Sequence, residues 1–417
     1  MKRAVVLILD GLRRDFVTPE LMPHLHSLRA SATWFDAHRS VLPSVTRCVS
    51  ACFATGCLPA RHGLQGNTMV LQEKSGLVLH DAGEPGFLPH RRRVKGRSLD
   101  VPTMAERLAG NGGSVIMGNV SPGATYTQDP DGFGFLHHRA GSYGPGRQPL
   151  ADGFRDLKPD LAGDSLMVDR FITEVLFGRQ PGLAQLWTAE PDHLQHEVPL
   201  GSPEHLAMLR GADAHAGLVI QAVARMRAAG EDVLLLIGSD HGHQTVSGVV
   251  DVAAELEAAV PDAAGGFIAA ANGTAALIYV EPSRPELRSR LGMALRDAAW
   301  AERVVEADEL KAVGHTTANG LAFVVSMASS EHRNAHGVPG CSLVAKANAG
   351  KPDRLGFGQH GGLGRWEQAP VLMLQGPGFE PGEAREAATS VLDAAPTILR
   401  HLDVAAHGLD GQALQRG

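Results

Sequence analysis

DVLLLIGSDHG, at residues 232–242, is the most informative stretch of this 417-residue chain. It begins with a short, strongly apolar run of the kind found in strands that are buried on both faces of a parallel sheet. The run ends at Gly238, and Asp240 and His241 follow almost at once. We therefore expect a central strand whose carboxyl end carries polar side chains with a functional role.

Strand-like and helix-like segments alternate on both sides of this stretch. Residues 203–230, just before it, keep apolar side chains at the i, i+3, i+4 spacing of a helix and end at a glycine. Further strands are expected at 4–9, 35–42, 114–119 and 183–192, further helices at 21–32 and 102–112, and a return of the same pattern at 369–379 and 390–402. This order predicts an α/β fold with a mostly parallel central sheet flanked by helices.

Residues 244–356 depart from this alternation. Alanine-rich helical pieces mix there with two strand-like runs, at 275–282 and 321–328. We interpret the segment as a smaller inserted α+β lobe. The main core is then expected to comprise residues 1–243 and 357–417.

Composition and charge are those of an ordinary globular protein. The chain is 44% hydrophobic and 20% charged, with a formal net charge of −7. An acidic balance gives no reason to expect a nucleic-acid polymer or a membrane as partner, and it says nothing of oligomeric state. The basic stretch HRRRVKGRS, at 90–98 within an expected long loop over 70–98, is either a solvated surface or a substrate contact.

The cellular location is predicted from the apolar runs and the cysteines. The run at 4–9 is too short for the core of a signal peptide, and no run approaches the ~18–20 residues of a membrane span. None of the four cysteines is spaced as C-x-x-C, so we expect small, buried thiols in a reducing compartment. These cysteines are Cys48, Cys52, Cys57 and Cys341. The sequence thus predicts a cytoplasmic protein.

Carboxylate and imidazole side chains follow the ends of several expected strands. In an open α/β sheet, ligands bind at the carboxyl ends of the strands, so these groups can converge on one edge. They are Asp10, Asp192 with His196, Asp240 with His241, and His360 in GQHGG at 358–362. Three clustered carboxylates repel one another unless cations lie between them. A mixed carboxylate and imidazole set suits zinc, with manganese or iron as alternatives.

Thr46 stands where LPSVTRCVSACFATG, residues 42–56, turns into an expected helix. Serine and threonine favour the N-cap of a helix, because the side-chain oxygen accepts a backbone N–H that has no partner within the helix. A helix N-terminus is also a natural anion site, so Thr46 could instead be a nucleophile. The stretch alone leaves both roles open.

Taken together, these segments resemble the alkaline phosphatase superfamily, specifically its type I phosphodiesterase/nucleotide pyrophosphatase family. The resemblance extends from residue 4 to about residue 414 and is poor over 244–356. It is carried by ILDG (8–11), PSVT (43–46), TGCLPARHGLQGN (55–67), EPDHLQH (190–196), GSDHG (238–242) and GQHGG (358–362). It implies an alkaline-phosphatase-like catalytic core around a central sheet.

The resemblance also implies roles for individual residues. Two divalent metal ions, most often zinc in such sites, would be held by two sets of side chains. The first set is Asp192, His196 and His360, and the second is Asp10, Asp240, His241 and the Thr46 oxygen. Thr46 would attack phosphorus and form a phosphothreonine, while Asn67 would donate a hydrogen bond to a phosphoryl oxygen. The implied enzyme cleaves phosphodiester or pyrophosphate bonds of a small phosphorylated substrate, nucleotides among them.

The substrate is where the chain departs from this family. Nucleotide-cleaving members usually carry a phenylalanine after the nucleophile, and this chain has Arg47. Arg47 could bind a second phosphate or a carboxylate, or it could point away, whereas Trp187 could supply a stacking face. HGGLGRWEQAPVL, at 360–372, is also similar to phosphonoacetate hydrolase. A C–P bond hydrolase or a phosphomonoesterase is therefore the alternative.

The same motifs disfavour two other classes of protein. A sulfatase needs a C-x-P-x-R signature, which Thr46 and Arg47 do not supply. A metal-binding scaffold on the same fold would have lost a ligand or the nucleophile, and neither is missing. The histidines beside the motifs are expected to lie around the metal ligands or on the surface rather than to be ligands; they are His193, His243 and His336.

Overall fold

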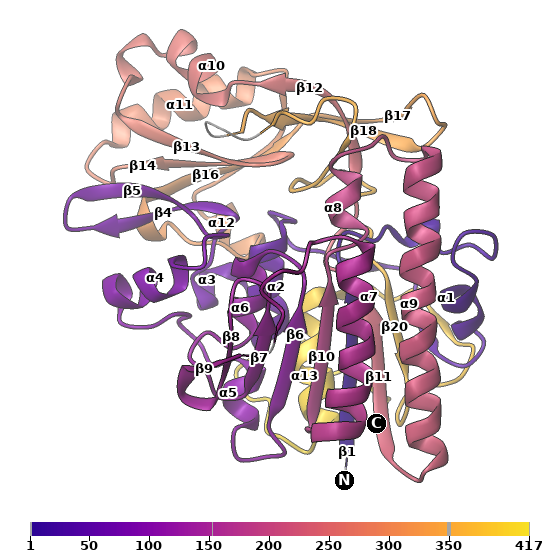
Figure 1. The fold of residues 1–417 in the computed structure, drawn as a ribbon. Helices are drawn as coiled ribbons and strands as arrows, with labels where there is room; N and C mark the ends of the chain where they lie inside the picture. The colour runs from indigo at the N-terminus through magenta and orange to yellow at the C-terminus, as the bar shows by residue number, and fades with distance from the viewer. Residues whose placement is uncertain (1, 152, 348–351, 417) are drawn as a thin grey trace.

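A ten-stranded sheet forms the centre of the computed structural model, which describes residues 2–151, 153–347 and 352–416. The strand order is β21-β2-β20-β11-β1-β10-β6-β7-β8-β9. The five central parallel strands are β11 (Asp232–Gly238), β1 (Lys2–Leu9), β10 (Leu183–Thr188), β6 (Ser114–Gly118) and β7 (Phe135–His138). Strand β20 (Leu372–Gln375) pairs antiparallel with β11 and with β2 (Thr33–Phe35). The expected mostly parallel α/β sheet is confirmed (Figure 1).

Short strands complete the edges of this sheet. They are β21 (Ala384–Arg385), β8 (Ser142–Gly144) and β9 (Gln148–Leu150), while β3 (His38–Arg39) pairs separately with β22 (Thr389–Ser390). The single strand expected at 35–42 is thus wrong. The chain turns after Phe35, where the Asp36 carboxylate accepts a hydrogen bond from the Trp34 indole at 2.6 Å. It then continues in a different sheet.

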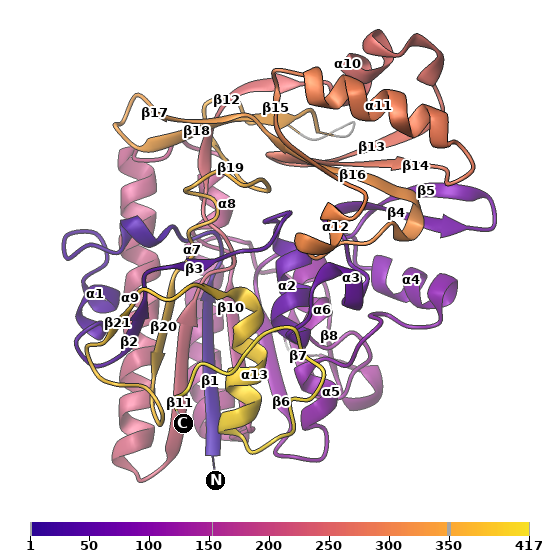
Figure 2. The same ribbon diagram turned by 180° about the vertical axis from the view of Figure 1, so that it is seen from behind.

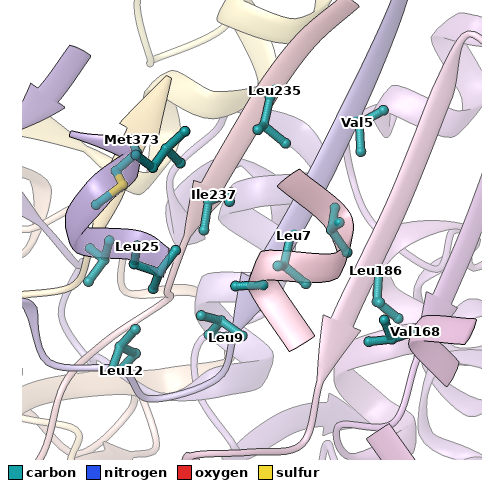
Figure 3. Close-up of a cluster of buried hydrophobic side chains, with 14 of the residues drawn as sticks. Val5, Leu7, Leu9, Leu12, Leu25, Val168, Leu186, Leu235, Ile237 and Met373 are labelled. Atoms are coloured by element: carbon teal, nitrogen blue, oxygen red, sulfur yellow. The ribbon is translucent and has the colours of Figure 1, made fainter. Parts of the chain in front are cut away.

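The strand β1 is buried along both faces because its neighbours are covered by helices on each side. Val5, Leu7 and Leu9 point into one hydrophobic cluster, together with side chains of β10 and β11 (Figure 3). Ala4, Val6 and Ile8 alternate with them and belong to a second cluster on the opposite face. This is why the sequence of β1 is apolar without interruption.

Helices cover both faces of the sheet (Figures 1 and 2). The first face is covered by α9 (Pro203–Ala228), α7 (Leu161–Arg170), which continues into a π-helix over Phe171–Arg179, and α1 (Pro23–Leu28). The second is covered by α2 (Thr46–Thr55), α5 (Met104–Leu108), α6 (Pro122–Gln128) and α13 (Ala394–His401). The expected helix at 203–230 matches α9 closely, and those at 21–32 and 102–112 are shorter than expected. No helix in the described ranges is both long and apolar enough to cross a membrane.

Two smaller four-stranded sheets lie above the carboxyl ends of the central strands. One contains β17 (Ser329–Arg333), β18 (Pro339–Ala345), β12 (Gln244–Val250) and β19 (Gly358–Gln359). The other contains β13 (Phe267–Asn272), β14 (Ala275–Val280), β16 (Leu321–Met327) and β15 (Ala301–Glu306), with α10 (Val252–Ala259), α11 (Pro285–Asp297) and α12 (Glu309–Ala312) around it. The division into a core and a lobe at 244–356 stays a prediction, and residues 348–351 of that lobe lie outside the described residues.

The long loop expected at 70–98 is wrong. The segment forms a hairpin of β4 (Thr68–Glu73) and β5 (Gly76–Asp81), followed by the helix α4 (Phe87–Lys95); the short α3 (Pro59–His62) precedes it. Met69 and Leu71 pack with residues of α4, whereas Val70 packs with the β14 side of the lobe. Burial on both faces turns this segment into ordered structure. Within the basic stretch, Arg91 is buried and forms an ion pair with Asp100 at 2.7 Å.

Candidate metal centre

A cavity of about 440 Å³ opens where β1, β10 and β6 end, and residues of β13, β18 and β19 also line it. The ends of β1, β10 and β11 each deliver a carboxylate to this edge of the sheet. Asp10 follows β1, Asp192 begins the short helix α8 (Asp192–Gln195) after β10, and Asp240 follows β11. Thr46 begins α2, and His360 follows β19. The predicted metal ligands from distant parts of the chain thus meet in one region.

Three imidazoles surround one oxygen of Asp192. The distances from Asp192 Oδ1 to the Nε2 atoms are 3.1 Å for His243, 3.3 Å for His196 and 3.4 Å for His360. The Nδ1 atom of each ring faces a backbone carbonyl oxygen, of Gly11 at 3.2 Å, Gly358 at 2.8 Å and Ser44 at 2.7 Å respectively. A ring that donates its Nδ1–H to a carbonyl presents a lone pair at Nε2. Three imidazole nitrogens around one carboxylate oxygen fit a cation between them.

A second group of side chains adjoins the first. His241 Nε2 lies 3.0 Å from Asp240 Oδ2, 3.6 Å from Asp10 Oδ1 and 3.2 Å from Thr46 Oγ1. The rings of His241 and His360 stack with their centroids 3.5 Å apart, so the two groups are in direct contact. This places all seven predicted ligands around two adjacent points.

The electrostatics of these buried acids also fit cations. Burial, and then the charges of Asp240 and Asp192, raise the pKa of Asp10 well above its ordinary value. Both carboxylate oxygens of Asp10 and the Oδ2 atom of Asp240 are buried and have no hydrogen-bond partner among the described residues. Buried, unpaired carboxylates are costly unless they coordinate metals. The donor set of carboxylates, imidazoles and one hydroxyl is one that zinc accepts.

Thr46 does not cap its helix. The residue at the N-cap of α2 is Val45, and the helix start has no side-chain capping bond. The Thr46 side chain is buried, and its hydroxyl lies beside His241 at the junction of the two ligand groups. The loop before it is tied to the loop of His360, because Ser44 N–H donates to Gly361 O at 2.9 Å. The structure therefore leaves the Thr46 hydroxyl available for chemistry.

Asn67 lines the cavity with its amide oriented by the chain around it. Its Oδ1 atom accepts a hydrogen bond from Arg47 N–H at 3.0 Å, which leaves the Nδ2 group as a donor. The backbone N–H of Asn67 donates to Asn272 Oδ1 at 2.7 Å, across 205 residues of sequence. Asn272, at the end of β13, was not found by the sequence analysis. It lies in the segment for which the sequence motifs gave only a poor resemblance, so they offered no signal for it.

The two substrate contacts expected from the sequence are placed differently. Arg47 lines the cavity directly beside Thr46. Trp187 does not line it: the side chain is 1% exposed and packs edge-on against Phe53, with ring centroids 6.1 Å apart. Because Trp187 lies within β10, before the strand reaches the edge, its side chain points into the core of the sheet. The structure does not bring it to the candidate site.

The neighbouring histidines also differ in their positions. His243 was expected to lie outside the ligand set, yet it is fully buried and is the imidazole nearest to Asp192 Oδ1. His193 is on the rim of the cavity, and His336 is exposed. His243 lies two residues after His241, in the short segment between β11 and β12. The spacing of these two histidines was the available signal.

A mostly parallel α/β sheet with clustered acids, imidazoles and a hydroxyl at its carboxyl edge is the architecture of a metal-dependent hydrolase. The model of the protein family described as type I phosphodiesterase/nucleotide pyrophosphatase matches residues 4–292. The chain belongs to this family and is a hydrolase of its kind. The resemblance proposed from the sequence motifs is confirmed.

Solved structures support the fold. The murine ectonucleotide pyrophosphatase/phosphodiesterase 5 is 18% identical with a TM-score of 0.68, over 98% of this chain and 97% of that one. An inactive variant of the same murine protein in complex with AMP is 18% identical with a TM-score of 0.69, over 99% and 98% of the two chains. The human protein is 17% identical with a TM-score of 0.66, over 98% and 97%. No curated protein matches the sequence.

The cysteines agree with the expectation of free thiols. All four are free; Cys48, Cys52 and Cys57 are buried, and Cys341 is half-buried. The cytoplasmic location stays a prediction.

Proposed function

We propose that the protein hydrolyses phosphodiester or pyrophosphate bonds of a small phosphorylated substrate, with Thr46 as the nucleophile. The observation that carries this proposal is the position of the Thr46 hydroxyl, 3.2 Å from His241 Nε2, where the two ligand groups meet. A cavity of about 440 Å³ is the size of a small-molecule site. The AMP complex of the murine protein on the same fold makes a nucleotide a reasonable first candidate.

The residues fit a pair of divalent cations. Asp192, His196 and His360 would hold the first, with His243 as an additional donor. Asp10, Asp240, His241 and the Thr46 oxygen would hold the second. When bound, such ions act as Lewis acids, lower the pKa of a coordinated hydroxyl and neutralise charge on phosphoryl oxygens. Zinc suits the mixed ligands best, and manganese or iron are the alternatives.

The remaining steps follow from the chain itself. Thr46 Oγ forms a bond to phosphorus while the bond from phosphorus to the leaving oxygen breaks, which gives a phosphothreonine. The hydroxyl gives up its proton and the leaving oxygen takes one up. Water then hydrolyses the phosphothreonine and restores Thr46. The Asn67 Nδ2 group donates to a phosphoryl oxygen, and its orientation is fixed by Arg47 N–H at Asn67 Oδ1.

The backbone around Thr46 is held rigidly for this attack. Ser44 bonds to the loop of His360 through its backbone and its hydroxyl, which accepts from Gly361 N–H at 3.1 Å and donates to Gly362 O at 3.1 Å. Asn272 accepts from the backbone of Asn67 on the other side of the cavity. Nucleophile and hydrogen-bond donor are therefore positioned by separate parts of the chain.

The test combines metal analysis with three substrates. Metal-loaded protein is assayed with bis(p-nitrophenyl) phosphate, p-nitrophenyl phosphate and phosphonoacetate. Preference for the diester supports the proposal. Preference for the monoester, or phosphate release from phosphonoacetate, would replace it with the corresponding alternative, and no turnover at full metal occupancy would favour a scaffold.

A further inference from the structure

Two arginine side chains share the cavity with the candidate metal ligands. Arg47 follows Thr46 in the first turn of α2, and Arg354 lies between β18 and β19. Both line the cavity and both are half-buried. They approach it from opposite ends of the chain, so their meeting is a property of the tertiary structure.

Neither guanidinium has a protein partner within the described ranges. Neither guanidinium group forms an ion pair or a hydrogen bond with a described residue, and Arg47 Nε and Arg354 Nη1 are buried without an acceptor. Arg13 is also buried, but each nitrogen of its guanidinium group is paired. Its guanidinium binds the Asp15 carboxylate and the carbonyl oxygens of His243 and Pro339. Buried polar groups of native proteins are almost always paired, so an unpaired arginine in a cavity calls for a ligand.

The two charges also act on each other. Burial lowers the pKa of Arg354; the charge of the Asp192 carboxylate opposes this, and the charge of Arg47 adds a smaller lowering. Arg139, the third arginine of the cavity, is different, since it donates to Asn119 O at 2.7 Å and Val120 O at 3.0 Å. Like charges near one another are stabilised by an anion that both can bind.

We infer that Arg47 and Arg354 form an anion subsite that selects substrates with a second anionic group close to the phosphorus under attack. The inference rests on the proposed function and adds the substrate class. A guanidinium fork matches a carboxylate or a phosphate equally well, so the second group is either of these. Arg47 then occupies the place of the usual phenylalanine with an anion site instead of a stacking face, and the burial of Trp187 agrees with this.

The test measures binding, so it does not depend on turnover. Metal-loaded protein is titrated calorimetrically with methylphosphonate, phosphonoacetate and methylenediphosphonate, which carry one anionic group, an added carboxylate and an added phosphonate. We expect at least one two-anion ligand to bind roughly 10-fold more tightly than methylphosphonate. Arg47→Ala and Arg354→Ala should each remove most of that preference. A preference for phosphonoacetate identifies a carboxylate, and one for methylenediphosphonate identifies a phosphate.

Controls separate the subsite from other causes. Arg92→Ala, at an exposed position of α4, should keep the full preference. Metal chelation by methylenediphosphonate does not depend on the arginines, so it cannot explain a loss in the variants. Arg47→Lys and Arg354→Lys keep the charge and should retain part of the preference, which guards against a misfolded alanine variant.

The outcomes are distinct. Equal binding of all three ligands by the wild type, or an unchanged preference in both alanine variants, would overturn the inference. Absence of turnover on every phosphoester with this preference intact would reject the proposed function and keep the subsite.

Discussion

Replacing Thr46 by alanine separates a catalytic role from a structural one. The change removes one buried methyl group, worth about 1 kcal/mol, and a hydroxyl contact with His241, worth about 1 kcal/mol. The higher helix propensity of alanine offsets about 0.5 kcal/mol of this lost stability, and no capping bond is lost. The free energy of unfolding should therefore fall by only about 1.5 kcal/mol.

Activity should change far more. Loss of the nucleophile should lower kcat by at least about 10⁴-fold, equivalent to about 5.5 kcal/mol in the transition state. The assay is hydrolysis of bis(p-nitrophenyl) phosphate by metal-loaded protein, with thermal unfolding measured on the same samples. Thr46→Ser keeps the hydroxyl and should retain activity within roughly tenfold.

If Thr46→Ala turned over substrate within tenfold of the wild-type rate, Thr46 could not be the nucleophile. A loss of several kcal/mol of stability would instead show that the hydroxyl holds the fold together. Mass spectrometry of acid-quenched wild type should detect a phosphate on the peptide containing Thr46, and the alanine variant should lack it.

Three further predictions concern the metals and the surrounding acids. Removing the metals with a chelator should abolish turnover and lower the unfolding temperature, because the buried carboxylates of Asp10 and Asp240 then repel each other. Zinc should restore both properties, and a metal-free protein with unchanged turnover and stability would contradict the metal centre. His243→Ala should weaken metal binding 10- to 100-fold in a chelator competition, whereas the exposed His336→Ala should not; equal affinities would remove His243 from the ligand set. Burial raises the pKa of Glu367 to about 7, so the folded state binds its proton more tightly than the unfolded state. The stability that this group contributes is present at low pH and is lost as the pH rises through 7. Between pH 5 and pH 8 the free energy of unfolding of Glu367→Gln should therefore rise by about 2 kcal/mol relative to that of the wild type, measured by denaturant unfolding. If the stabilities of the two proteins changed in parallel with pH, the raised pKa of Glu367 would be contradicted.

Much of the fold could be predicted from local patterns. The helix α9 is long and amphipathic, and β1 and β11 are apolar without interruption, so their periodicity identifies them. The hairpin β4–β5 could not be recognised in this way. Val70 alternates with Met69 and Leu71 between two different hydrophobic clusters, and one of these comes from residues about 200 positions later. Tertiary burial outweighs weak local propensity there.

Some residues of the candidate site could likewise be predicted from local sequence, and others could not. Residue type and place at a strand end were enough to name Asp10, Asp192 and Asp240 as candidate ligands, because parallel strands bring their carboxyl ends to one edge. Chain order is sufficient for such groups. The order of strands along the chain does not determine where a side chain points, and that direction decides which other residues reach the site.

Three residues show what depended on folding in three dimensions. Trp187 has the residue type of a stacking platform, but its position within β10 directs it into the core. His243 reaches Asp192 because its Nδ1 atom meets Gly11 O from another strand end. Arg354 reaches the cavity from a segment with no recognisable motif. Local sequence specified which groups are available for chemistry. Long-range packing selected the ones that face the candidate site, because contacts between distant segments set the direction of each side chain.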